Sequence, residues 1–230
     1  MWNIKYLVKE FLQNKSLQDF INRRFKDENK AIIDKEYMAY IVMKNGDLFY
    51  PSENLGTAAS VYQDYIFDDI RRDDIVIDIG ACIGGFSIPA SRMSDHVYAV
   101  EPVMAEELRG NVSLNKRNIQ VIEAALGNGD IIEAKWMNHR KSVKAMTLSD
   151  IKSFCGGCDF LKIDCEGNEW LIEPEELDGI RRIEMEVHKV GKPFSEMENM
   201  LRKAGFNYKV DKPRGCVGVW IVHAVNPNVD

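Results

Sequence analysis

The feature that most constrains the fold is a mostly β-branched run, Ile75 to Ile79, that leads directly into Gly80-Ala81-Cys82-Ile83-Gly84-Gly85, named here the glycine loop. Glycines permit the positive φ of a tight turn and let the backbone approach a ligand closely. The helical pattern that follows presents unpaired N–H groups at its first turn to a polar or anionic ligand. We therefore predict a buried strand, a ligand-binding turn and a helix.

Downstream of this unit, short apolar runs alternate with helical segments, which indicates an α/β fold with a parallel sheet and crossover helices. The predicted strands are 75–79, 97–100, 120–124, 160–163 and 183–187. The predicted helices are 58–70, 85–92, 104–115, 148–154 and 194–204. Two further strands, 208–210 and 217–225, are typical of a terminal antiparallel hairpin.

Residues 1–70 have a different pattern and predict an extension that packs on a core of residues 71–230. Between residues 2 and 25, apolar residues recur every three or four positions, as in amphipathic helices. The dipeptide Asn45-Gly46 lies between two β-rich runs, which is a hairpin signal. We expect one domain with a helical and β-hairpin extension.

With 230 residues, of which 45% are hydrophobic, the chain can form one globular domain with a real core. No apolar run approaches the roughly 20 residues that span a bilayer, and the first residues lack the order of a secretory signal. We expect a cytoplasmic protein with no membrane partner. The net charge of −6 disfavours a broad nucleic-acid surface. The five cysteines, which include the Cys155 and Cys158 pair, are interpreted as reduced thiols without a zinc site.

The spacing of the glycine loop, Gly-x-x-x-Gly after Asp78, differs from the Gly-x-Gly-x-x-Gly of dinucleotide-binding oxidoreductases. Glu101-Pro102 ends the next strand, and Glu101 follows Asp78 by 23 residues. A carboxylate at this position can accept hydrogen bonds from both hydroxyls of a ribose. Ala124 and Ala125 end the third strand, where small side chains leave room for an adenine ring or simply pack closely. The ligand is predicted to be a nucleoside.

Together these residues resemble the FkbM family of S-adenosylmethionine-dependent methyltransferases. The resemblance rests on the Asn45-Gly46 hairpin, Tyr65, 76–81 with Gly84, Glu101-Pro102, Asn111 with Asn115, 125–127 and 161–169. Its most distinctive element is Lys162-Ile163-Asp164-x-Glu166-Gly167-x-Glu169. The resemblance covers most of the chain after about Tyr40.

The resemblance implies a Rossmann-like class I methyltransferase sheet of seven strands, six parallel and one antiparallel. It also implies that Gly80 and Gly84 face the methionine end of S-adenosylmethionine, and that Glu101 faces its ribose. The full set of predicted cofactor-binding residues is Asp78, Gly80, Ala81, Gly84, Glu101, Pro102, Ala124, Ala125 and Asp164. Family members often methylate oxygens of sugars or secondary metabolites. Cys82 stands where they often have Asn.

Asp164, Glu166 and His188 are the candidate catalytic residues, because each follows a predicted parallel strand at the edge where such sheets bind ligands. A carboxylate or an imidazole there can accept the proton of a methyl-acceptor hydroxyl. Asp164 can instead hold the amino group of the cofactor. Glu166 can brace the next helix, and His188 can be structural. Glu186 and His188 share a strand face, but two ligands are too few to predict a metal.

The predicted function is therefore methyl transfer to a hydroxyl of a small molecule or glycan. Two alternatives stay open: methylation of RNA or protein, and a noncatalytic module that binds the cofactor. The identity of the acceptor and the oligomeric state are not determined by these patterns.

Overall fold

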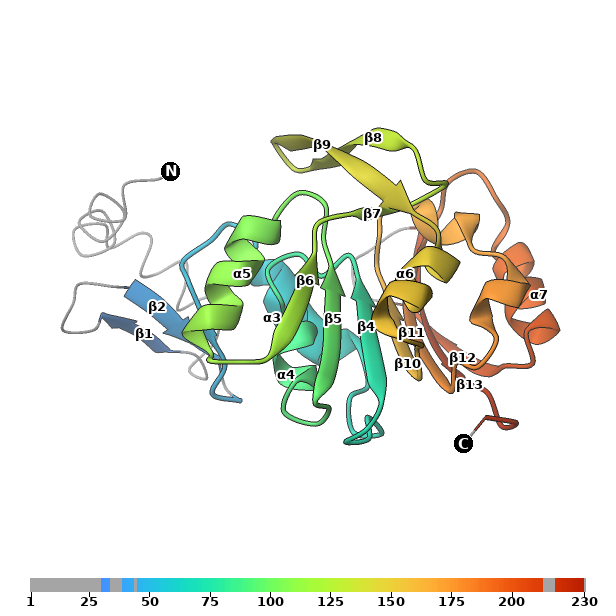
Figure 1. Cartoon of the computed structure of the whole chain (residues 1–230), viewed down its shortest axis with the longest axis horizontal. Helices are drawn as coiled ribbons and strands as arrows, with labels where there is room; N and C mark the ends of the chain where they lie inside the picture. Colours follow the sequence, from blue (N-terminus) through green and yellow to red (C-terminus); the bar gives the residue numbers. More distant parts are fainter. Residues whose placement is uncertain (1–29, 34–38, 44, 213–217, 230) are drawn as a thin grey trace.

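The computed structural model describes residues 30–33, 39–43, 45–212 and 218–229 (Figure 1). The amphipathic pattern at 2–25 and Cys216 lie outside the described residues. Among the helices within these ranges, none is long and apolar enough to cross a membrane. The proposed division into an extension of 1–70 and a core of 71–230 stays a prediction.

A seven-stranded sheet forms the centre of the molecule (Figure 1). In spatial order its strands are β12 (Asn207–Asp211), β13 (Val219–Val225), β11 (Arg182–His188), β10 (Phe160–Ile163), β4 (Ile75–Ile79), β5 (His96–Val100) and β6 (Ile119–Ile122). Only β13 runs antiparallel to its neighbours in this sheet, which confirms the predicted arrangement of six parallel strands and one antiparallel strand.

The middle strands are apolar because the sheet is covered on both faces. All four residues of β10 are buried, and four of the five residues of β4 are buried. Both strands have the bounds that the sequence predicts. The predicted strand 120–124 is displaced: β6 ends at Ile122, because the chain turns at Ala124 and enters another strand at Ala125.

Two hydrophobic clusters hold the helices to the sheet. One cluster contains residues of α3 (Leu55–Asp64), α4 (Ser87–Ala90) and α5 (Ala105–Leu114). The other contains residues of α6 (Leu148–Cys155), α7 (Phe194–Lys203) and the 3₁₀ helix η2 (Pro174–Leu177). The amphipathic pattern of α7 buries Met197 and Leu201, four residues apart on one helix face. The crossover helices predicted from the sequence are thus present.

The predicted helix 58–70 is wrong at both ends, since α3 spans Leu55–Asp64. The helix stops because Tyr65 adopts an extended backbone, with φ −117° and ψ 153°, and its side chain is buried. The following residues, through Ile70, form turns and loop. This early end directs the Tyr65 side chain toward the sheet.

The N-terminal hairpin is confirmed, and it belongs to a three-stranded antiparallel sheet of β1 (Lys30–Ile33), β2 (Ala39–Val42) and β3 (Leu48–Phe49). Gly46 in its turn has a φ of +85°. Two side-chain amides, one in α5 and one at its C-terminal cap, attach the hairpin to the core. Asn111 Oδ1 accepts from the Tyr50 N–H at 2.9 Å, and Asn115 Oδ1 accepts from the Leu48 N–H at 2.8 Å.

A second small sheet, which the sequence pattern did not predict, consists of β7 (Ala125–Leu126), β8 (Ile131–Trp136) and β9 (His139–Met146). The antiparallel hairpin of β8 and β9 projects from the central sheet and lies over one of its edges (Figure 1). Most of its side chains are exposed or half-buried, so it lacks the apolar run of a core strand.

Candidate functional site

The glycine loop is fixed between β5 and the segment after β10. The N–H groups of Gly80 and Ala81 donate to the Val100 carbonyl at 2.9 and 3.2 Å. Gly80 has a φ of +77°, and a Cβ on it would lie 1.7 Å from the Asp164 carbonyl oxygen. Only glycine fits this position. The close approach brings the glycine loop against the residues that follow β10.

Glu101 organises the other side of the glycine loop. Its Oε2 accepts from the Cys82 N–H at 2.8 Å, and its Oε1 accepts from the N–H groups of Val103 and Met104 at 2.7 and 2.9 Å. The side chain is buried, and burial raises its pKa even though these backbone hydrogen bonds lower it. The carboxylate is therefore held rigidly at the end of β5, with one acceptor position of Oε2 still free.

Asp78 lies beneath the glycine loop. Its Oδ2 accepts from the Ser87 hydroxyl, and its Oδ1 is 3.1 Å from Lys162 Nζ. Lys162 Nζ also donates to the Gly80 carbonyl at 3.0 Å. Burial lowers the pKa of Lys162, but the carboxylates of Asp78 and Asp164 outweigh burial and raise it. The buried ion pair of Asp78 and Lys162 therefore stabilises the glycine loop through the hydrogen bond from Lys162 to Gly80.

A cavity of about 340 Å³ opens above the glycine loop. That volume lies within the range of small-molecule sites. Seven of the nine predicted cofactor residues line it: Gly80, Ala81, Glu101, Pro102, Ala124, Ala125 and Asp164. The other two, Asp78 and Gly84, are not on the lining. Among the candidate catalytic residues, Asp164 and Glu166 line the cavity, whereas His188 does not.

The hairpin β8–β9 and the helix α3 cover the cavity, and the sequence pattern predicted neither contribution. Residues 132–136 of the hairpin line it, as do Thr57, Ala58 and Val61 of α3. Trp136 Nε1 donates to Asn54 Oδ1 at 2.7 Å and so joins the hairpin to the start of α3. The sequence signal for this cover was short: Ile132, Ala134 and Trp136 alternate with the charged Glu133 and Lys135.

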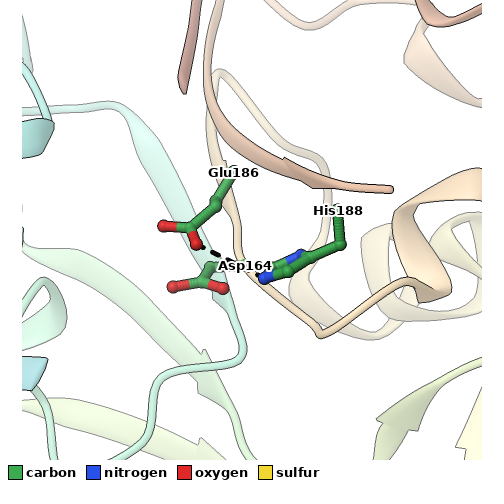
Figure 2. A group of neighbouring side chains, drawn as sticks. All are labelled: Asp164, Glu186 and His188. Atoms are coloured by element: carbon green, nitrogen blue, oxygen red, sulfur yellow. Dashed lines mark ion pairs between the residues drawn. The ribbon is translucent and has the colours of Figure 1, made fainter. Parts of the chain in front are cut away.

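The carboxyl ends of β10 and β11 bring together three of the polar side chains at this edge, Asp164, Glu186 and His188, which point toward one another (Figure 2). Glu186 Oε1 lies 3.3 Å from His188 Nε2, and Glu166 Oε2 lies 3.5 Å from the same nitrogen. The buried Tyr65 hydroxyl is 3.3 Å from Asp164 Oδ2 and 3.4 Å from Glu186 Oε2, and donates to one of them at a time.

Glu169 connects the loop after β10 to the end of β11. Its Oε2 accepts from the Gly167 N–H at 2.8 Å. Its Oε1 accepts from the His188 N–H at 2.6 Å and lies 3.3 Å from His188 Nδ1. Positive φ angles at Glu166 (+57°) and Gly167 (+108°) make the turn that allows this contact. Glu169 therefore orients the His188 ring.

The ionisation of this cluster departs from ordinary values. Burial lowers the pKa of His188, but hydrogen bonds to Glu169 and Glu186 outweigh burial and raise it to about 10. Burial raises the pKa of Asp164 to about 7 against the attraction of Lys162. Burial also raises the pKa of Glu166. In Glu169, the hydrogen bonds from His188 overcome burial, and the pKa is lowered.

Three residues of the site, Tyr65, Lys162 and Glu169, carry the family resemblance in the sequence but were not predicted as site residues. Lys162 and Glu169 belong to the motif that carries the family resemblance, but their contacts depend on tertiary structure. Tyr65 reaches Asp164 across 99 positions of the chain. The Cys155 and Cys158 thiols are free and buried, and burial raises the pKa of Cys155 to about 12, as expected for ordinary reduced thiols.

Comparison with solved structures identifies the fold as that of class I methyltransferases. An rRNA methylase from Streptococcus thermophilus is 12% identical with a TM-score of 0.51, and the match covers 74% of this chain and 96% of that chain. A precorrin-6y C5,15-methyltransferase from Geobacter metallireducens is 15% identical with a TM-score of 0.50, covering 76% of this chain and 93% of that chain.

The methyltransferase FkbM domain matches residues 78–208, which is more than half of the chain. The matched region begins at Asp78 beneath the glycine loop and includes Glu101, Asp164 and His188. The chain belongs to the FkbM methyltransferase family. It is accordingly an S-adenosylmethionine-dependent methyltransferase, as the sequence predicts.

Proposed function

We propose that the protein methylates a hydroxyl oxygen on a small molecule or a glycan. The observation that carries this proposal is a pair of carboxylates, Asp164 and Glu166, on the lining of the same cavity that the glycine loop and Glu101 line. An oxygen nucleophile loses its proton as it attacks a methyl carbon, and a carboxylate within reach can accept that proton.

The cavity residues on the glycine-loop side, named here the donor side because they would hold the methyl donor, fit S-adenosylmethionine. Gly80 leaves the backbone uncovered at the cavity wall, and Glu101 offers its free acceptor position to a ribose hydroxyl. Ala124 and Ala125 are small enough to leave space for a flat ring beside them. When bound, the cofactor supplies a sulfonium methyl group, whose C–S bond breaks toward sulfur as the new O–C bond forms.

Glu166 is the proton acceptor in this proposal. Its side chain is 53% exposed and lines the cavity, so that an acceptor hydroxyl can reach it. His188 is a positioning residue, because its Nδ1 faces Glu169, its Nε2 faces Glu186 and Glu166, and it is absent from the cavity lining. Trp136 and the rest of the hairpin β8–β9 exclude water from the reacting atoms.

The charge of the lining favours a neutral or cationic small acceptor over a nucleic acid. Its carboxylate side chains are those of Glu101, Glu133, Asp164 and Glu166, and its amine side chains are those of Lys135 and Lys162. Lys162 is buried, and its Nζ forms an ion pair with the Asp78 carboxylate. A phosphate backbone needs clustered Lys and Arg side chains, and this cavity presents the opposite balance.

The test is to incubate the protein with methyl-tritiated S-adenosylmethionine and with separate acceptor fractions: small metabolites, glycans, total RNA and protein. We expect label in the metabolite or glycan fraction, in a product whose methyl group NMR assigns to an ether oxygen. Label confined to RNA or protein would contradict the proposal. Binding of the cofactor with no labelled product in any fraction would favour a noncatalytic module.

A further inference from the structure

We propose that Asp164, Glu186 and His188 form a binding site for one divalent cation (Figure 2). Each residue offers one ligand atom, and these atoms all lie within 4.8 Å of one another. The sequence alone suggested only the two residues of β11 as a half-site. The fold adds the third ligand from β10.

The arrangement follows from the sheet. Glu186 and His188 are two positions apart on β11 and therefore lie on one face of that strand. Asp164 comes directly after β10, where Ile163 pairs in parallel with Met185. The register thus brings the Asp164 side chain beside Glu186 at the carboxyl edge of the sheet.

The spacing of the ligand atoms fits a metal ion. Around an ion with bonds of about 2.1 Å, neighbouring ligand atoms are about 3.0 Å apart and opposite ones about 4.2 Å apart. Glu186 Oε1 and His188 Nε2 are 3.3 Å apart, close to the neighbouring distance. All the pairs lie within 4.8 Å, so small side-chain rotations bring them onto one ion.

The surroundings of His188 match those of a metal-bound histidine. Such residues almost always donate their second ring N–H to a carboxylate or carbonyl, which fixes the tautomer. Glu169, which is fully buried, lies 3.3 Å from His188 Nδ1 and also accepts from the His188 backbone N–H. With Nδ1–H directed at Glu169, the Nε2 lone pair is directed toward Glu186.

The local charge also favours a cation. Three carboxylates, Asp164, Glu166 and Glu186, surround the site. Lys162 Nζ is 3.9 Å from Asp164 but nearer to Asp78, at 3.1 Å. Two carboxylate oxygens and one imidazole nitrogen suit Mn²⁺ better than the all-oxygen preference of Mg²⁺.

Three protein ligands leave coordination positions of the ion open, and Asp164 connects the site to the cavity lining. An acceptor hydroxyl that occupies an open position has a lowered pKa and gives up its proton more readily to Glu166. This use of the ion rests on the proposed function, whereas binding of the ion does not.

The test is a titration of the metal-stripped wild-type protein with MnCl₂, without methyl donor or acceptor, followed by calorimetry and electron paramagnetic resonance. We expect one Mn²⁺ per chain, with ¹⁴N coupling from an imidazole in the pulsed spectrum. Glu186→Gln and His188→Gln should each weaken Mn²⁺ binding at least about tenfold. Glu175→Gln, which removes an exposed carboxylate on η2, should leave it within about twofold.

The pulsed spectrum of the wild type keeps the proposal testable if the variants fail to fold. Absence of bound Mn²⁺ at millimolar concentration would overturn it, as would bound Mn²⁺ without nitrogen coupling, or equal affinity in wild type and folded Glu186→Gln. Because the titration contains no donor or acceptor, failure of oxygen methylation leaves its outcome unaffected.

Discussion

The donor side and the acceptor side of the cavity are built differently. On the donor side, backbone N–H groups of the glycine loop and of the segment after β5 bind Val100 and the buried Glu101. On the acceptor side, half-buried side chains at the ends of β10 and β11 contact one another, and they have few backbone partners. The donor side is rigid because its geometry is fixed by the main chain. The acceptor side depends on side-chain charge.

The largest effect should come from Gly80→Ala on the donor side. The added methyl group overlaps the Asp164 carbonyl, and alanine is strained at a φ of +77°. Overpacking of about 1–3 kcal/mol and left-handed strain of about 1–2 kcal/mol together predict a loss of about 3 kcal/mol or more in unfolding free energy. Urea denaturation measures this loss.

Gly129→Ala is the matched control, since Gly129 has a φ of +98° but an added Cβ meets no described atom within 4 Å. Its unfolding free energy should fall only by the backbone strain of alanine at positive φ, about 1–2 kcal/mol. Equal losses in the two variants would mean that the approach of the glycine loop to Asp164 does not constrain the fold.

The kinetics of Glu166→Gln should distinguish the role of the acceptor side from that of the donor side. Removal of a general base costs about 10²–10⁴-fold in rate, so we expect kcat to fall about 100-fold while the Kd for S-adenosylmethionine changes less than about twofold. Glu175→Gln is the charge-matched control. A large rise in the Kd for S-adenosylmethionine with kcat preserved would mean that Glu166 binds the cofactor. That result would contradict its assignment to the acceptor side.

Glu101→Gln should have the reverse effect. The amide cannot accept all the hydrogen bonds that the carboxylate accepts from the backbone and from a ribose. Hydrogen bonds to charged groups contribute about 2 kcal/mol, so affinity for S-adenosylmethionine should fall about 30-fold by calorimetry. Glu106→Gln, on an exposed position of α5, should be neutral. Unchanged affinity of Glu101→Gln for S-adenosylmethionine would show that Glu101 does not contact the ribose.

The smallest expected effect is a gain from Cys82→Asn. Cys82 has a φ of +49°, a left-handed conformation that Asn adopts more readily than other non-glycine residues. We expect up to about 1 kcal/mol of added stability in urea denaturation. Cys82→Ser has a similar size without that preference, and an equal gain there would rule out backbone strain as the cause.

The difference between the two sides also explains what the sequence could predict. The bounds of β4 and β10 were predictable because these strands are short apolar runs buried on both faces. The positions of Gly80 and Glu101 follow from their fixed distance along a βαβ unit. A local pattern therefore described most of the donor side.

The acceptor side depends on contacts that no local pattern contains. Tyr65 meets Asp164 only because α3 ends early, and Glu169 reaches His188 only through the turn at Gly167. The hairpin β8–β9 was not predicted because the apolar alternation in β8 is short and some of its apolar residues lie outside the core; Ile131 is 77% exposed. Amphipathic patterns report burial, and this cover is mostly on the surface.

The most direct test of the central claim is a crystal structure of the protein with S-adenosylmethionine. The account predicts a ribose hydroxyl within hydrogen-bond distance of Glu101 and the sulfonium methyl group directed toward Asp164 and Glu166. A ribose away from Glu101, or a methyl group directed away from those two carboxylates, would contradict the division of the cavity into a donor side and an acceptor side.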